Sequence, residues 1–110
     1  MGKIKKYAAI ILEILQHYDD PNNPIETHLI TDLERHYYQV LRMGWVDLDN
    51  LMMRIVLYLQ IKPDGKIWIL ENWTEDEITD TLIEKGVPKT DIVLGLLPEY
   101  VRKDSGFAVA

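Results

Sequence analysis

The sequence predicts an α+β fold built on an antiparallel β-meander of about four strands. A long N-terminal helix should cross one face, and a second, capped helix and a short helical turn should lie near the C-terminus. Residues 1–18 show helical apolar periodicity, residues 51–61 alternate apolar with other side chains, and residues 62–65 form a turn sequence. With 110 residues, 47% of them hydrophobic, we expect one domain spanning 1–110.

The N-terminal helix is predicted from apolar side chains that cover an arc of about 200° when wound at about 100° per residue. That arc is wider than one sheet requires, so the helix either sits deep in a core or touches another subunit with its flank. Pro21 and Pro24 should end it, because proline disfavours helix in the preceding residue. Since Glu13 and His17 interrupt the apolar run and no small-residue cleavage site follows, we expect neither a signal peptide nor a membrane span.

Four strands are expected, at residues 25–34, 37–46, 51–61 and 66–72. The third alternates most regularly, and its apolar side chains should form one core-facing row: Leu51, Met53, Ile55, Leu57, Leu59 and Ile61. Lys62-Pro63-Asp64-Gly65 then turns the chain, since proline presets a turn dihedral and glycine accepts a positive φ. Gly44 is expected to mark a bulge in the second strand.

The C-terminal third is predicted to begin with a helix. Thr74-Glu75-Asp76-Glu77 has the form of a capping box, in which a hydroxyl and a carboxylate satisfy the free N–H groups of the first turn. The helix should end at Gly86, in the left-handed capping position, and Pro88 should open a short helical turn that continues to Leu94. The apolar terminus, residues 105–110, should form an edge strand or an extended arm lying on this subunit or another.

The charge of the chain is unsuited to nucleic acid. Its net charge is −6, from 18 acidic against 12 basic residues, and six acids lie between Glu71 and Glu84 with no intervening base. A free-standing nucleic-acid binder normally carries a basic stripe, so we expect no direct DNA binding by this chain alone. The acid run is either a solvated helix face or a surface that docks a basic protein. The absence of cysteine suits a cytoplasmic protein.

No arrangement of reactive residues predicts catalysis. The only serine is Ser105, in the terminal segment, and the glycines are scattered singly, so neither a serine triad nor a phosphate loop is expected. A weak metal-site pattern exists, because His28, Asp32, Glu34 and His36 would share one strand face if the strand continued that far. An ordinary solvated face is the alternative. We therefore predict no catalytic residue, no metal and no cofactor.

Aromatic and arginine side chains are the better functional candidates, because Trp, Tyr and Arg are the residues that anchor protein interfaces. Several lie on the central strands, where half of them could instead belong to a second core face covered by the second helix. The predicted partner-binding residues are Tyr38, Arg42, Trp45, Trp68, Arg102 and Phe107.

Several short runs follow one another in a characteristic order: Tyr38-Gln39-Val40, Gly44-Trp45, Gly65-Lys66-Ile67-Trp68-Ile69, Trp73-Thr74-Glu75, Gly86-Val87-Pro88-Lys89, Asp91-Ile92-Val93-Leu94-Gly95 and Phe107-Ala108-Val109-Ala110. Together they resemble the XisI family, the fdxN-element excision controlling factors of cyanobacteria. The resemblance runs from about Lys3 to the last residue. The chain departs from it at Tyr37, where many members have His, at Tyr58 and Gln60, where they often have His-x-Asp, and at an apparently added Pro63.

The resemblance implies an accessory, non-enzymatic role in programmed DNA excision during heterocyst differentiation. It implies two partners, a site-specific recombinase and a companion protein, XisH, which looks like a restriction-endonuclease-type fold. Because of these departures, the resemblance does not imply an acid, base or ligand role for Tyr37, Tyr58 or Gln60. Because the chain is acidic, we also expect it to exercise control through protein contacts and not through binding to DNA.

Two other functions remain open at the sequence level. One is an acidic inhibitor or antitoxin-like protein whose carboxylate run occupies a basic nucleic-acid channel on a nuclease-like partner. The other is a small metal-dependent enzyme using the face around His28. We also expect a homo-oligomer, because the first helix and the segment around Phe107 offer more apolar surface than one small domain can cover.

Overall fold

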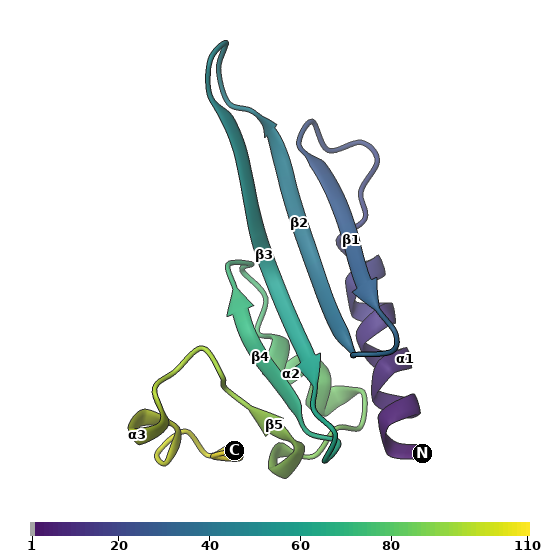
Figure 1. Ribbon diagram of the computed structural model, residues 1–110, viewed down its shortest axis with the longest axis vertical. Helices are drawn as coiled ribbons and strands as arrows, with labels where there is room; N and C mark the ends of the chain where they lie inside the picture. The colour runs from purple at the N-terminus through teal and green to yellow at the C-terminus, as the bar shows by residue number, and fades with distance from the viewer. Residues whose placement is uncertain (1) are drawn as a thin grey trace.

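The computed structural model describes residues 2–110, and its elements confirm the α+β fold class. The helices are α1 (Gly2–Gln16), α2 (Ile78–Glu84) and α3 (Glu99–Arg102), with a 3-10 turn η1 (Lys89–Asp91). The strands are β1 (Glu26–Asp32), β2 (Tyr37–Trp45), β3 (Leu51–Ile61), β4 (Ile67–Asn72) and β5 (Ile92–Val93). They form one sheet in the order β1-β2-β3-β4-β5 (Figure 1). The first four strands make the predicted antiparallel meander, and β5 adds a short parallel edge that the sequence did not predict.

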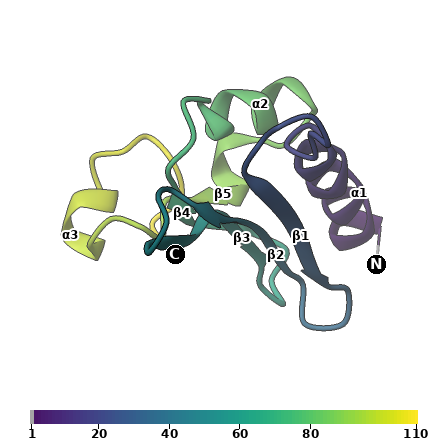
Figure 2. The same cartoon turned by 90° about the horizontal axis from the view of Figure 1, so that it is seen from above.

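Helices α1 and α2 cover the same face of the sheet, whereas α3 lies beyond the β4–β5 edge (Figure 2). The covered face holds the core, which joins Ile11 and Leu15 of α1 and Leu82 of α2 to the strands. Central strand residues such as Tyr38 and Leu59 are completely buried there. We call the opposite side of the sheet the open face.

A bulge divides β3 and overturns the prediction of one core-facing row. Val40 of β2 is paired with Leu57, but the next residue, Leu41, is paired with Ile55, so Val56 is an extra residue on β3. Because side chains alternate along a strand, this insertion reverses which face the odd-numbered residues occupy. Leu57, Leu59 and Ile61 are buried as predicted, whereas Leu51 and Met53 are 45% and 58% exposed.

The predicted position of the bulge was also wrong. Gly44 is paired regularly with Met52, and the register shift lies at Val40/Leu41 instead. A Cβ atom at Gly44 would stand 3.6 Å from the Cα of Ile25, which is an ordinary contact, so packing does not require glycine at this position.

The β2–β3 hairpin projects from the body of the molecule (Figure 1). Strand β4 pairs with β3 only from Leu57 to Ile61, so the first half of β3 is paired with β2 alone. We call this projecting part, residues 41–55, the arm. It lengthens the molecule to 45 Å against 31 and 24 Å in the other two directions.

The predicted capping box is wrong, because α2 begins only at Ile78 and its N-cap, Glu77, makes no side-chain cap. Thr74 belongs instead to a turn organised by Asn72. Oδ1 of Asn72 accepts hydrogen bonds from the backbone N–H of Thr74 (3.0 Å) and from its hydroxyl (2.6 Å). The amide of Asn72 donates to the backbone oxygen of Asp76 (3.1 Å). This turn carries the chain from the sheet edge to α2.

Replacing Asn72 by Ala is expected to lower the free energy of unfolding by about 1–3 kcal/mol, because three hydrogen bonds of the turn lose their partner. Urea denaturation measures the change. Asn22→Ala is the matched control, since Asn22 is exposed and its side chain makes no hydrogen bond within residues 2–110. Equal stability of the two variants would show that the turn does not depend on Asn72.

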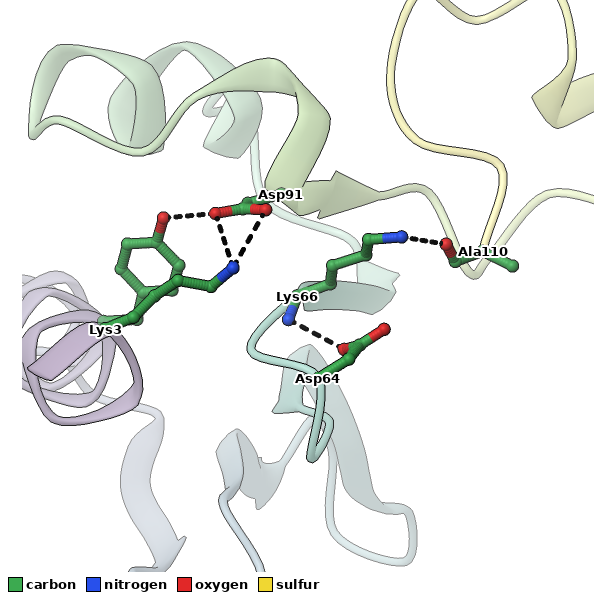
Figure 3. A network of polar contacts seen from close by, with 6 residues as sticks. Lys3, Asp64, Lys66, Asp91 and Ala110 are labelled. Atoms are coloured by element: carbon green, nitrogen blue, oxygen red, sulfur yellow. Dashed lines mark hydrogen bonds and ion pairs between the residues drawn. The ribbon is translucent and has the colours of Figure 1, made fainter. Parts of the chain in front are cut away.

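The C-terminal segment lies on its own subunit. After η1 the chain enters β5 at Ile92, where a continuing helical turn was predicted, and the last residues return to β5 through a hydrogen bond from Ala108 N–H to Ile92 oxygen (2.9 Å). Arg102 Nη1 donates to Val109 oxygen (2.7 Å), and Lys66 Nζ donates to the backbone oxygen of Ala110 (Figure 3). The C-terminal segment is thus held within the subunit by three separate contacts.

Candidate partner-binding face

The arm presents an apolar surface on the open face. Cross-strand pairing aligns Trp45 with Leu51, Met43 with Met53, and Leu41 with Ile55. All six side chains lie on the open face, because the Val56 bulge moves the β3 members away from the helices. Trp45 is 68% exposed and Met53 is 58% exposed. Large side chains in such a contiguous, exposed arrangement are typical of a surface that binds another molecule.

The base of the arm adds an aromatic hollow. Trp73, just after β4, is 63% exposed, and the guanidinium carbon of Arg54 lies 4.9 Å from the centre of its ring. A hollow of about 610 Å³ lies beside them, lined by Leu41, Met53, Arg54, Ile55, Tyr58, Glu71 and Trp73. Its walls are mostly apolar side chains with one cation and one carboxylate, so it offers hydrophobic contact with a few polar anchors.

Two of the predicted residues, Trp68 and Arg102, come together near the C-terminal segment. Two cations stand over the Trp68 ring, with Lys62 Nζ at 3.9 Å and the guanidinium carbon of Arg102 at 5.1 Å from its centre. The ring also packs over Gly95, where a Cβ atom would approach it to 2.7 Å. Because Arg102 is also bonded to Leu97 and Val109, this cluster mainly fixes the tail.

Tyr38 and Arg42 lie on the helix-covered face. Tyr38 is completely buried, and its hydroxyl lies 2.9 Å from Nδ1 of His36. It has no accessible surface to offer, so we take Tyr38 out of the partner-binding set. Arg42 is half-buried near Tyr18, and its Nε atom is buried without a hydrogen-bond partner among residues 2–110.

Phe107 lies in the C-terminal segment and is half-buried against the core. The Lys89 ammonium stands 5.9 Å from its ring centre. The side chain is therefore occupied within its own subunit, and Trp45 alone of the predicted residues stands mostly exposed on the arm.

The residues of the weak metal pattern are not brought together. His28 is paired with Glu26 at 3.6 Å, whereas Asp32 closes the following turn by accepting bonds from the backbone N–H groups of Glu34 and Arg35. These bonds and the Arg35 side chain hold the pKa of Asp32 below its usual value. His36 adopts a positive φ of 61° and turns toward Tyr38. Within residues 2–110 no three His, Cys, Asp or Glu side chains form a group that could hold a metal.

Apart from Glu71, which lines the hollow at the base of the arm, the acid run lies in the turn before α2 and along α2, on the helix-covered side of the sheet. One member, Asp76, accepts a hydrogen bond from the hydroxyl of Tyr18 (2.6 Å) between α1 and α2. Burial, and then this bond, raise the pKa of Tyr18 to about 12. Other members, among them Glu75, Glu77 and Asp80, are exposed. The run is thus a largely solvated surface with one structural carboxylate.

The family model described as XisI protein matches residues 1–109 of this chain. The chain belongs to the XisI family. The sequence resemblance is thereby confirmed over almost the whole length.

Two crystal structures of XisI proteins from Anabaena variabilis are similar to this chain. One, of the fdxN element excision controlling factor XisI, has a TM-score of 0.85 and 38% identity, covering 98% of this chain and 99% of its own. The other, of a XisI-like protein, has a TM-score of 0.88 and 38% identity, covering 97% and 99%. No curated protein matches the chain. Among residues 2–110, every helix falls short of the length or the apolar character that a membrane-spanning helix needs.

Three of the positions at which the sequence departs from the XisI resemblance, Tyr37, Tyr58 and Gln60, lie side by side on the open face. Tyr37 is paired with Gln60 across β2 and β3, and its ring packs edge-on against Tyr58 with 6.5 Å between ring centres. Phenol hydroxyls and an amide can both donate and accept hydrogen bonds. This part of the XisI fold therefore provides packing and hydrogen-bonding groups here.

Sequence reasoning missed Met43, Leu51, Met53 and Trp73 as surface residues. The regular alternation of residues 51–61 predicted burial for the two β3 members. Nothing in the local sequence marks Val56 as the extra residue, since valine is a common strand residue. The sequence at Trp73 did carry a signal, because a tryptophan just after a strand and before an acidic turn is poorly placed for a core.

Proposed function

We propose that this XisI-family chain is a non-enzymatic controlling factor for programmed excision of a DNA element, and that it acts by binding another protein through the arm. One relative of 38% identity carries the name of an excision controlling factor. The observation that carries the binding mode is the exposed row on the arm, in which Trp45 is 68% and Met53 is 58% exposed. The partners implied by the family resemblance are an XisH-like companion and a site-specific recombinase.

Protein contact suits this surface better than DNA contact. The net charge of −6 repels phosphate backbones, and the arm presents apolar side chains where a DNA-binding face would present Lys and Arg. Exposed Trp and Met on a projecting hairpin are the residue types enriched at the centre of protein interfaces. The chain alone should therefore leave duplex DNA unbound at physiological salt, which a gel-shift titration measures.

Replacing Trp45 by Ala is expected to weaken binding to the XisH-like companion by about 2 kcal/mol, or roughly 30-fold in Kd, because buried tryptophans dominate interface energetics. Calorimetric titration of the purified companion gives the Kd. Tyr100→Ala is the matched control, since Tyr100 is an aromatic residue of α3, distant from the arm and 74% exposed. An unchanged Kd for the Trp45 variant would sink the proposal.

The acid run supports a second candidate, an acidic inhibitor or antitoxin-like partner of a nuclease-like protein. Its exposed members Glu75, Glu77 and Asp80 lie before and along α2 and could occupy a basic channel. The dependence of partner affinity on ionic strength distinguishes the two candidate functions. A complex held by carboxylates weakens steeply as ionic strength rises, whereas one held by Trp45 and Met53 keeps its affinity.

A further inference from the structure

The outer edge of β3 is open along the arm. Strand β4 reaches only to Leu57, and the oxygen of Val56 accepts the last hydrogen bond on that side, from Trp73 N–H at 2.7 Å. The preceding residues, Leu51–Ile55, are paired with β2 on their other side and with no strand of residues 2–110 on this one. Five residues of regular strand therefore offer an unpaired edge beside the apolar row of the open face.

The alternation of hydrogen bonds along the β2–β3 pair shows which backbone groups of β3 are free. Val46 N–H donates to the oxygen of Asn50 at 2.9 Å, so these two residues face each other across the hairpin. In an antiparallel pair the facing residues alternate with residues whose groups point away. Met52 and Arg54 therefore bond to β2, whereas Leu51, Met53 and Ile55 direct both N–H and C=O outward.

This edge lacks the usual safeguards against pairing. Natural edge strands carry lysines, prolines or bulges that prevent the addition of another strand. Leu51-Met52-Met53-Arg54-Ile55 contains one charge and no proline, and the bulge lies after it, at Val56. Such an edge is suited to β-strand addition, in which main-chain hydrogen bonds supply affinity and alternate side chains supply fit.

We propose that the strand which pairs with this edge is the same segment of a second copy, antiparallel about a two-fold axis at Met53. The three outward residues then match one another: Met53 faces Met53, and Leu51 faces Ile55 of the second copy. Every free N–H and C=O of these residues gains a partner, and the apolar row of the open face continues unbroken from one copy to the next.

The charges of the arm favour this antiparallel arrangement. The tip carries Asp47 and Asp49, whereas Arg54 is the one charge of the edge segment. Antiparallel pairing about Met53 separates the two acidic tips, whereas a parallel arrangement would place them together. Because pairing occurs in the plane of the sheet, it leaves the open faces free and joins them into one larger surface. The inference does not depend on which protein binds there.

Light scattering tests the proposal on the purified full chain. The wild-type mass is expected to be twice the 12.9 kDa of one chain. Met53→Pro removes an outward N–H without removing a bond to β2, and it should halve the mass. Met53→Ala is the control, because it keeps that N–H, and it should remain dimeric. A wild-type monomer at all concentrations, or a dimeric Met53→Pro variant, overturns the proposal.

Hydrogen exchange of the wild-type protein tests the proposed β3 interface even if the proline variant fails to fold. The amides of Leu51, Met53 and Ile55 should become protected as protein concentration rises. Those of Met52 and Arg54 should be protected at every concentration, because they bond to β2 within one chain. If the exchange rates at Leu51, Met53 and Ile55 do not change with protein concentration, any dimer interface lies elsewhere and the proposal is wrong.

Discussion

Replacing Tyr38 by Ala is expected to lower the free energy of unfolding by about 3–5 kcal/mol, the usual cost of removing a large aromatic ring from a core. Tyr38 is 0% exposed and lies in the centre of β2, within the cluster that joins the sheet to α1. Small domains have only about 5–15 kcal/mol of stability in total. Urea denaturation followed by circular dichroism should show a large fall in the transition midpoint.

Tyr38→Phe separates the ring from its hydroxyl. It keeps the packing and loses only the contact with Nδ1 of His36 at 2.9 Å, so about 1 kcal/mol is expected. Because the hydroxyl has no exposure, the Phe variant should also bind the companion with unchanged affinity. Weakened binding without a loss of stability would restore Tyr38 to the partner-binding set.

Raising the pH from about 10 to 12 is expected to remove roughly 2 kcal/mol of stability for each of two buried tyrosines. Burial, followed by a hydrogen bond to Asp91 (2.5 Å), raises the pKa of Tyr7 from 10.0 to about 12. The pKa of Tyr18 is raised equally, by burial and its bond to Asp76. The folded state thus favours the neutral phenols. Their contribution is complete below pH 10, the unfolded pKa, and is lost as the pH rises through the folded values.

The measurement is the free energy of urea unfolding as a function of pH. The double variant Tyr7→Phe/Tyr18→Phe should show a flatter decline across this window, because neither position can ionise. All other side chains, including Lys3 beside Asp91 (Figure 3), are the same in both proteins, so the difference in slope belongs to the phenols. Tyr100→Phe, at a residue 74% exposed, should leave the slope unchanged. A double variant as sensitive as the wild type would contradict the assignment.

The elements with strong local signals formed as the sequence predicted. The turn before β4 closes with a hydrogen bond from Lys62 N–H to Lys66 oxygen, and Gly65 adopts the positive φ of 90° that the turn needs. Gly86, at φ 103°, ends α2 as expected. In both places the backbone needs a positive φ, which glycine adopts readily. The local sequence is therefore sufficient to predict the turn and the helix end.

The candidate site was harder to predict than the fold. Trp45 stands mostly exposed on the arm, as a partner-binding residue must, whereas Tyr38 is buried and Trp68, Arg102 and Phe107 are engaged with their own subunit. Residue type alone does not distinguish an aromatic side chain that fills a core from one that anchors an interface. The choice depends on which face its strand turns toward α1 and α2, and no local pattern contains that information.

The sequence by itself determined the element types, the antiparallel meander and the family, because periodicity, turn residues and ordered motifs are local properties of a chain. Only the tertiary structure decided the face of each strand residue, the extra Val56, the parallel β5 and the return of the C-terminal segment to Ile92. These features arise when distant segments compete for the same hydrogen bonds and the same apolar surface. Their outcome places Leu51 and Met53 on the arm's surface and leaves the edge of β3 open.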